Sequence, residues 1–333
     1  MNKKLLLTTA LVGSVVLGGF AQAATKITGD LEVTLSSQSS EKAATNTGSS
    51  TIGREANLIV EGGNDTAIGA LTYGTKFTVD GKDATATEWY TSISKGMVTA
   101  GIGQDMGAGS DIDGTVVPHV SDQADTLMRG TGSYISAHIN PYSKAHVGLD
   151  VKALGGKFGV SYSPNNSNTV AESAAFTGDA IGDSAIEYSY IGSPVGYGIS
   201  IQAAHAEVNG DATSKSAETN KFGVAYAAGA FKIGAAVQDY TNGNNGGSQL
   251  DYSSIALGAT FTASDNLSIG IGSTEMSRSS DAAANTDEKI KFITVGYNLG
   301  GLGFDLSVAN VDNGKFVSGD DFQIVQLRTI NKF

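Results

Sequence analysis

The sequence predicts an all-β protein, specifically a transmembrane, antiparallel, up-and-down β-barrel of about sixteen strands. Three observations lead to this fold class. Hydrophobic residues recur with a period of two, short turns alternate with long polar connections, and aromatic residues gather near the ends of the expected strands. Together these features are typical of a barrel that crosses a membrane with its strands.

The N-terminus predicts an export signal. Residues 1–23 combine a basic start with an apolar run over 5–20 and end in an A-x-A motif. This order is that of a cleaved secretory signal peptide, so the mature barrel domain is expected to span 24–333. An uncleaved anchor helix is the alternative, although three glycines interrupt the short apolar run.

Composition restricts the partners of the chain. It contains no cysteine, so an exported form must be held together without disulfides. The formal net charge of −12 argues against nucleic acid as a partner.

The alternating pattern is clear in three segments, at 69–79, 220–238 and 255–272. In the first segment, Leu71, Tyr73 and Phe77 share one face and Lys76 lies on the other. The other two segments each contain a short turn between two alternating runs. Such alternation indicates half-buried strands, and the paired runs indicate hairpins.

The connections fall into two length classes. Short turns are expected at 62–65, 94–96, 154–156, 192–194, 228–229, 264–266 and 299–301. Long polar segments are expected at about 37–50, 80–87, 104–143, 164–182, 209–218, 240–250, 276–287 and 311–321. This division predicts about sixteen strands, with both chain ends on the side of the short turns.

Aromatic residues are expected to form two outward-facing girdles at the membrane interfaces. Near the short turns or the C-terminus lie Phe158, Tyr190, Tyr197, Tyr226, Phe231, Phe261, Tyr297, Phe304 and Phe333, and near the long loops lie Phe77, Trp89 and Tyr162. Ordinary core aromatics would show no preference for strand ends.

The final residues, 322–333, read as the closing strand. Leu327 and Phe333 share an apolar face, whereas Arg328 and Lys332 face the opposite way. Because a barrel in lipid cannot leave an open edge, this strand is expected to pair with the first strand at 26–35.

With these features the chain resembles the general porins of Gram-negative outer membranes, over essentially all of 24–333. The resemblance is carried by the hairpin rhythm, by "EWYTSISKGMVTAGIGQDMG" (88–107) and by "VQLRTINKF" (325–333). It implies a homotrimer in contact with outer-membrane lipid and lipopolysaccharide, and a third loop, about 104–143, folded into the lumen. It also implies that Phe333 is an assembly signal for the barrel assembly machinery. The chain departs from the family pattern at Gln104, where an arginine is usual, and at Thr329 and Asn331, where apolar residues are frequent.

Charged residues on the expected inward face define a candidate pore wall, because unpaired charges cannot lie in a packed core. The wall candidates are Lys76, Glu88, Asp150, Lys152, Glu187, Lys232, Asp305 and Arg328. The candidates in the constriction loop are Asp105, Asp111, Asp113, Asp122, Asp125 and Arg129. The acidic loop predicts a weakly cation-selective diffusion channel for small hydrophilic solutes.

Other chemistry has little support in the sequence. The four histidines lack metal-ligand spacing, so no metal site and no cofactor are expected. A calcium ion at "GSDIDG" (109–114) is an alternative to solvated loop carboxylates. The phase of the strand at 287–298 is ambiguous, because turning Ile293 outward also turns Lys291 outward.

Two other classes of protein remain open from the sequence. A secreted adhesin or surface-layer protein would share the signal and the β-rich composition, but it predicts neither girdles nor a terminal Phe333. An outer-membrane barrel enzyme would need a lipid-facing Ser–His pair, which the sequence does not supply. We therefore expect a channel and not an enzyme.

Overall fold

The computed structural model describes residues 25–40, 49–80, 83–108, 117–120, 145–164, 184–209, 217–241, 250–280 and 286–333. These residues form sixteen strands and two short 3-10 helices, η1 (Gln104–Met106) and η4 (Gly314–Phe316). The strands are β1 (Lys26–Ser40), β2 (Ser49–Asp65), β3 (Ala70–Asp80), β4 (Asp83–Lys95), β5 (Val98–Gly103), β6 (His146–Ala153), β7 (Gly156–Ser163), β8 (Ser184–Gly192), β9 (Ile199–Asn209), β10 (Ala217–Ala228), β11 (Phe231–Thr241), β12 (Leu250–Ser264), β13 (Leu267–Ser280), β14 (Glu288–Asn298), β15 (Leu302–Asp312) and β16 (Phe322–Lys332).

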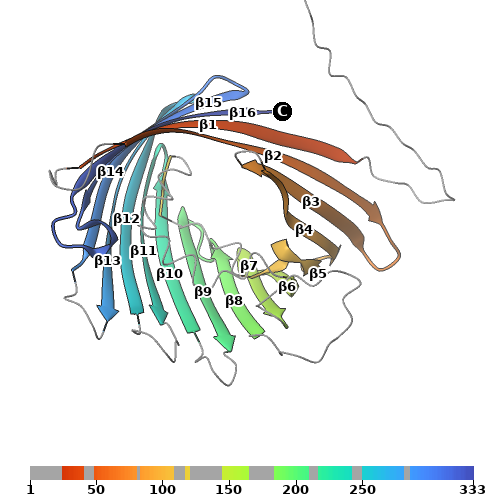
Figure 1. The fold of residues 1–333 in the computed structure, drawn as a ribbon. Helices are drawn as coiled ribbons and strands as arrows, with labels where there is room; N and C mark the ends of the chain where they lie inside the picture. Colours follow the sequence, from red (N-terminus) through yellow and green to blue (C-terminus); the bar gives the residue numbers. More distant parts are fainter. Residues whose placement is uncertain are drawn as a thin grey trace, which may run out of the picture.

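Each strand pairs antiparallel with its neighbours in the sequence, and β1 pairs with β16, so the sheet is a closed barrel (Figure 1). The predicted fold class and strand number are therefore confirmed. None of the helices in the described part of the chain is long and apolar enough to cross a membrane.

The first and last strands meet along eleven residue pairs, from Asp30 opposite Lys332 to Ser40 opposite Phe322. Beyond them, Phe333 and Gly29 exchange two backbone hydrogen bonds, each 3.0 Å long. The phenyl ring of Phe333 lies over Gly29, because a Cβ atom built at this glycine would stand 2.6 Å from the ring. The ring is 70% exposed. The expected closing strand is thus confirmed, whereas the role of Phe333 in assembly stays a prediction.

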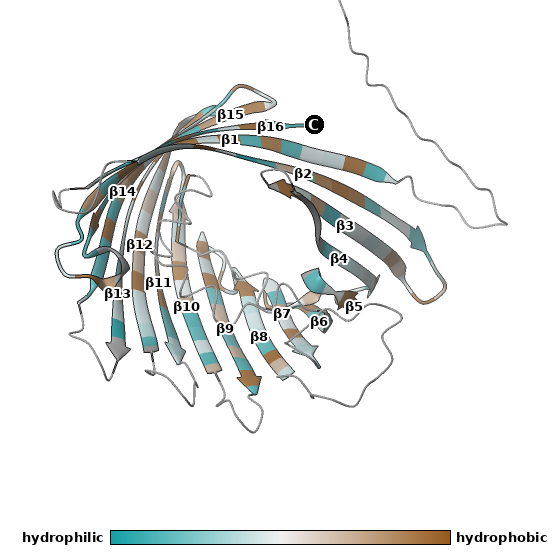
Figure 2. Cartoon of the chain, in the orientation of Figure 1, coloured by the Kyte–Doolittle hydropathy of each residue, from teal (hydrophilic) through white to brown (hydrophobic). Residues whose placement is uncertain are grey.

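Hydrophilic and hydrophobic residues are interspersed along the strands (Figure 2). Because successive side chains point to opposite sides of a strand, each strand has two different faces. The outward face exposes large apolar side chains, and adjacent strands bring aromatic rings together near the short turns. Phe158 and Tyr190 have ring centroids 4.6 Å apart, as do Phe231 and Phe261. Tyr197 is an exception, because β9 begins only at Ile199, and this tyrosine lies in the preceding connection with a positive φ of 52°.

The ambiguous strand is β14. Ile293 and Tyr297 are exposed on its outward face, whereas Ile290 and Phe292 are buried on its inward face. Alternation therefore also turns Lys291 outward.

One expected long connection is wrong. The segment about 80–87 is not a long loop, because β3 extends to Asp80 and β4 begins at Asp83. A register shift between Lys76 and Phe77 lets β4 carry an extra residue and continue to pair. The Thr-rich sequence of this segment looks polar, but threonine is a good strand former and ladder pairing needs only the backbone.

The sequence predicts a charged, hydrated inward face. In the structure this face is polar only in part. Two buried apolar clusters lie at the long-loop ends of β8–β16. The Val117 cluster consists of Val117, Ala236, Ala256, Ile290, Phe292, Ala309, Val311 and Phe322. The Phe316 cluster consists of Ala185, Ala206, Val208, Tyr240, Tyr252, Met276 and Phe316. Val117 and Phe316 belong to connections that follow β5 and β15, so these connections cover apolar wall that would otherwise face water.

Closure predicts the effect of shortening the chain at Phe333. Deleting this residue removes two backbone hydrogen bonds and the aromatic ring, which should lower the free energy of unfolding by about 1–2 kcal/mol. The substitution Phe333→Ala keeps the backbone bonds and should have a smaller effect. Two quantities are measured. The first is the temperature at which the barrel unfolds, seen as the loss of the faster-migrating band on gels, and the second is the amount of folded protein in outer-membrane fractions. Equal values for deletion mutant and wild type would show that this closure is unimportant.

Candidate pore-lining site

The inward faces of β1–β4 are rich in carboxylates. Asn57 is buried among them, and its amide donates hydrogen bonds to Asp30 (2.9 Å) and Glu55 (2.8 Å). Its carbonyl oxygen accepts a hydrogen bond of 2.8 Å from the hydroxyl of Thr78. On the same wall, the hydroxyl of Tyr90 donates to Glu61 (3.2 Å). These contacts link four strands through polar side chains.

The sequence analysis missed four of these wall carboxylates: Asp30, Glu32, Glu55 and Glu61. Alternation in β1 would have found two of them, because Leu31 and Val33 face outward. The two-residue period of β1 is therefore sufficient to predict Asp30 and Glu32 as wall residues.

Two of the predicted wall residues, Lys76 and Glu88, lie directly opposite each other on β3 and β4. Their charged groups are 3.2 Å apart. The structure therefore brings them together on the inward face, where both remain partly exposed.

Arg328 is the most buried charge at the seam of the barrel, with only 6% of its side chain exposed. Its guanidinium group lies 2.8 Å from Asp305 on β15 and 3.1 Å from Glu32 on β1. A second nitrogen, Nε, also donates to Asp305 (3.2 Å). One cation on β16 thus connects the last two strands to the first, and it compensates two carboxylates that would otherwise repel each other.

The wall formed by β6–β8 holds the start of the long connection after β5. The backbone N–H of Ala108 donates to the hydroxyl of Ser161 (2.8 Å), and this hydroxyl donates to the buried carboxylate of Glu187 (2.7 Å). Gln104 and His146 are also buried here. Glu187 therefore holds the backbone that follows η1, in addition to contributing charge to the wall.

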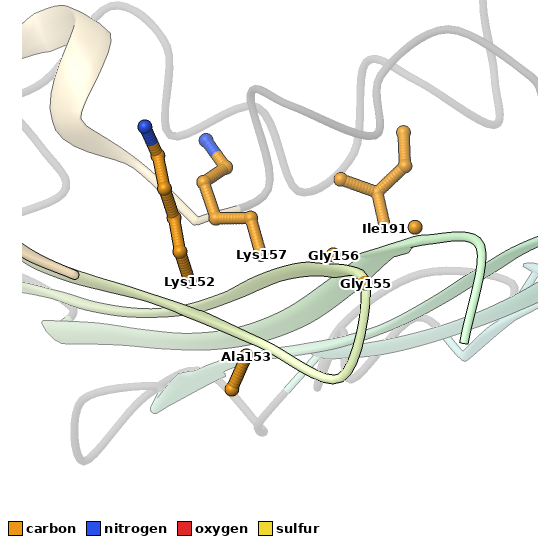
Figure 3. Close-up of a pocket in the computed structure, with 7 residues that line it drawn as sticks. Lys152, Ala153, Gly155, Gly156, Lys157 and Ile191 are labelled. Atoms are coloured by element: carbon orange, nitrogen blue, oxygen red, sulfur yellow. The ribbon is translucent and has the colours of Figure 1, made fainter.

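A basic group stands at the short-turn end of the same wall. Lys152 and Lys157 lie directly opposite each other on β6 and β7 and point to the same side, away from Ala153 (Figure 3). They border a pocket of about 510 Å³ beside Gly155. Asp150 lies 3.3 Å from the amine of Lys157.

Glycines on the inward face pack against residues 117–120, a described part of the 104–143 segment. A Cβ atom built at Gly234 would lie 2.7 Å from Cδ of Pro118. At Gly270 and Gly296 it would lie 2.8 Å and 2.5 Å from the side chain of Val120. These three residues, the glycine track, cross β11, β13 and β14. Pro118 and Val120 therefore rest on wall positions that have no side chain.

Most of the predicted constriction residues lie outside the described part of the chain. This holds for Asp111, Asp113, Asp122, Asp125 and Arg129, and for the side chain of Asp105, whose backbone lies in η1. The contacts of 104–108 and 117–120 are with the inward face of the wall, whereas a constriction across the lumen stays a prediction. No group of three His, Asp or Glu residues within the described ranges could hold a metal ion.

The glycine track predicts that added side chains will displace the segment at 117–120. Gly270→Val or Gly296→Val should push Val120 from the wall and change single-channel conductance in planar bilayers. Gly53→Val is the matched control, because a Cβ atom there meets nothing within 4 Å. Unchanged conductance in both track variants would mean that the packing of Val120 does not influence the pore.

The Arg328 triad predicts a stability effect that depends on charge. Arg328→Gln should lower the free energy of unfolding by roughly 1–3 kcal/mol, because it removes the guanidinium group that lies between two carboxylates. The triple variant with Glu32→Gln, Asp305→Asn and Arg328→Gln should recover part of this loss. Urea unfolding of the barrel in lipid vesicles would measure both. A triple variant less stable than the single one would contradict the electrostatic explanation.

Comparison with known proteins agrees with this geometry. The profile of a family described as Gram-negative porin matches residues 8–315. No curated protein sequence matches the chain significantly. Among solved structures, OmpT, an outer membrane protein of Vibrio cholerae in a trimer form, superposes with a TM-score of 0.70 at 13% identity. That superposition covers 94% of this chain and 100% of OmpT.

Two porins are similar in the same way. An anion-selective porin from Comamonas acidovorans gives a TM-score of 0.66 at 12% identity, covering 93% of this chain and 100% of that porin. A mutant of the porin of Rh. blastica gives 0.63 at 14% identity, with the same two coverages of 93% and 100%. These structures share the fold, and the family profile covers most of the sequence. The chain belongs to the Gram-negative porin family.

Proposed function

We propose that the chain forms a water-filled channel for the passive diffusion of small hydrophilic solutes and ions, with a weak preference for cations. The observation that carries the proposal is the acidic inward face of β1–β4. The described side chains on it include six carboxylates (Asp30, Glu32, Glu55, Glu61, Asp65 and Glu88) against two lysines (Lys26 and Lys76). Low-dielectric walls focus the field of such charges and raise the local concentration of counter-ions.

The sign of the selectivity rests on this chain's own residues. The similar porin from Comamonas acidovorans is described as anion-selective, so sharing the fold does not determine which ion is preferred. Ion preference in a pore follows the charged groups that line it. In this proposal the five loop aspartates, Asp105, Asp111, Asp113, Asp122 and Asp125, add negative charge. Gln104 stands where an arginine is usual in the family, so no positive charge offsets them at that position.

The further assignments follow from the family. We propose a homotrimer in the outer membrane, supported by the trimer form of the similar OmpT, with lipid and lipopolysaccharide around it. We also propose that residues 1–23 are a signal peptide removed on export, and that Phe333 is recognised by the barrel assembly machinery. In this proposal the protein is a channel without catalytic activity.

The selectivity is tested by reversal potentials across a potassium chloride gradient. The wild type should pass K⁺ more readily than Cl⁻ in about 0.1 M salt, and the preference should fade near about 1 M because the screening length falls from about 10 to about 3 Å. A wall variant (Asp30→Asn, Glu55→Gln, Glu61→Gln) and a loop variant with all five aspartates changed to Asn should each move the permeability ratio toward unity.

The matched control changes two carboxylates on the outward face, Glu207→Gln and Glu218→Gln, and should leave the ratio unchanged. An anion preference in the wild type would refute the cation assignment, and unshifted ratios in both variants would refute the assigned residues. Absence of any conductance from folded protein would refute the channel itself.

A further inference from the structure

We propose that the pore conducts current asymmetrically, because the charge that faces the lumen changes sign along the pore axis. The middle of the wall is acidic, and the short-turn end is basic. This inference rests on the proposed channel and adds a directional property to it.

Five lysines mark the basic end, and each occupies one of the two residues at the short-turn end of its strand. They are Lys26, Lys152, Lys157, Lys232 and Lys332. Register places two of them in the lumen, because Lys26 lies opposite Glu61 and Lys332 lies opposite Asp30. Residues directly opposite each other on paired strands point to the same face.

Local contacts place the other three lysines. Lys152 and Lys157 stand on the same side of β6 and β7 (Figure 3). Lys232 borders a pocket of about 340 Å³ together with Pro118 and His119, which lie against the inward face. Carboxylates on the inward face at this end are fewer, namely Glu61, Asp65 and Asp150. The short-turn end of the described wall therefore carries a net positive charge.

Packing does not explain this arrangement. Lys152 and Lys157 are directly opposed like charges, a pairing that lowers the stability of a sheet. Asp150 is 3.3 Å from Lys157 and offsets part of the repulsion. Within the described residues Lys152 forms no ion pair, so no carboxylate there offsets its charge.

The middle of the wall has the opposite balance. At least three residues farther from the short turns, the described side chains include seven inward carboxylates (Asp30, Glu32, Glu55, Glu88, Glu187, Glu288 and Asp305). Four cations of the described wall share this zone, namely Lys76, Lys221, Arg278 and Arg328. Carboxylates lie close to Lys76, at 3.2 Å, and to Arg328, at 2.8 Å.

The two zones should act separately at low salt. Apart from Lys332 and Asp30, which lie directly opposite each other, most members of the two zones are roughly 10–15 Å apart along the strands, given a rise of about 3.3 Å per residue. The screening length at about 0.1 M salt is about 10 Å. Cations then collect in the middle zone and anions collect at the short-turn mouth. A voltage that is positive on the long-loop side drives both ions toward the junction of the zones. The opposite voltage drives both away and depletes the junction.

Current should therefore be larger when the long-loop side is positive, by roughly 1.5-fold in about 0.1 M potassium chloride, and the asymmetry should vanish near about 1 M. Planar bilayers test this with the full protein at equal voltages of opposite sign. Orientation is assigned with Asn266→Cys, in an exposed short turn of a chain that has no other cysteine, using a membrane-impermeant thiol reagent on one side.

The deciding variant is Lys152→Gln with Lys232→Gln and Lys332→Gln, which should conduct equally in both directions at low salt and normally at high salt. Its control is Lys289→Gln with Lys291→Gln, two outward lysines whose loss should leave the asymmetry intact. Symmetric current through an open wild-type channel, or asymmetry of the opposite sign, would overturn the inference and leave the channel standing. Asymmetry that survives in the deciding variant would overturn the lysine assignment, whereas absence of any conductance would refute the proposed function instead.

Discussion

The structure depends on one requirement, that every backbone N–H and C=O in a membrane-spanning sheet has a partner. An open sheet would leave two unpaired edges, and here the edges of β1 and β16 satisfy each other along eleven pairs. The two hydrogen bonds between Gly29 and Phe333 extend this pairing to the last residue. Arg328 reinforces the same seam with side chains, since its partners lie on β1 and β15.

Closure separates the two faces of every strand. The outward face can be apolar in lipid, so it carries exposed leucine, isoleucine and aromatic side chains without any protein core behind it. The inward face is then free to hold charge, because the lumen can contain water. Asp30, Glu55 and Asn57 show how this face organises polar groups, since one buried amide bonds to two carboxylates.

The lumen wall is also a packing surface. Val117 and Phe316 bury apolar wall residues at the long-loop ends, and the glycine track accommodates Pro118 and Val120. Arg278 lies 4.9 Å from the centre of the Phe316 ring, which adds a cation–π contact to that cluster. Inside this barrel, apolar packing positions chain segments and inward charge sets the potential around them.

The sequence by itself determined the period-two alternation, and with it the barrel class, the strand number and the closing strand at 322–333. These features are local and repeat in every hairpin, so one chain is enough to read them. Tertiary structure alone decided which distant residues meet: Arg328 with Glu32, Ser161 with Ala108, and Val120 with Gly296. It also resolved β14, where Ile290 and Ile293 have the same hydrophobicity but face opposite sides. Alternation assigns two faces to a strand, but only neighbouring strands and the segments packed inside the barrel decide which residues each face meets.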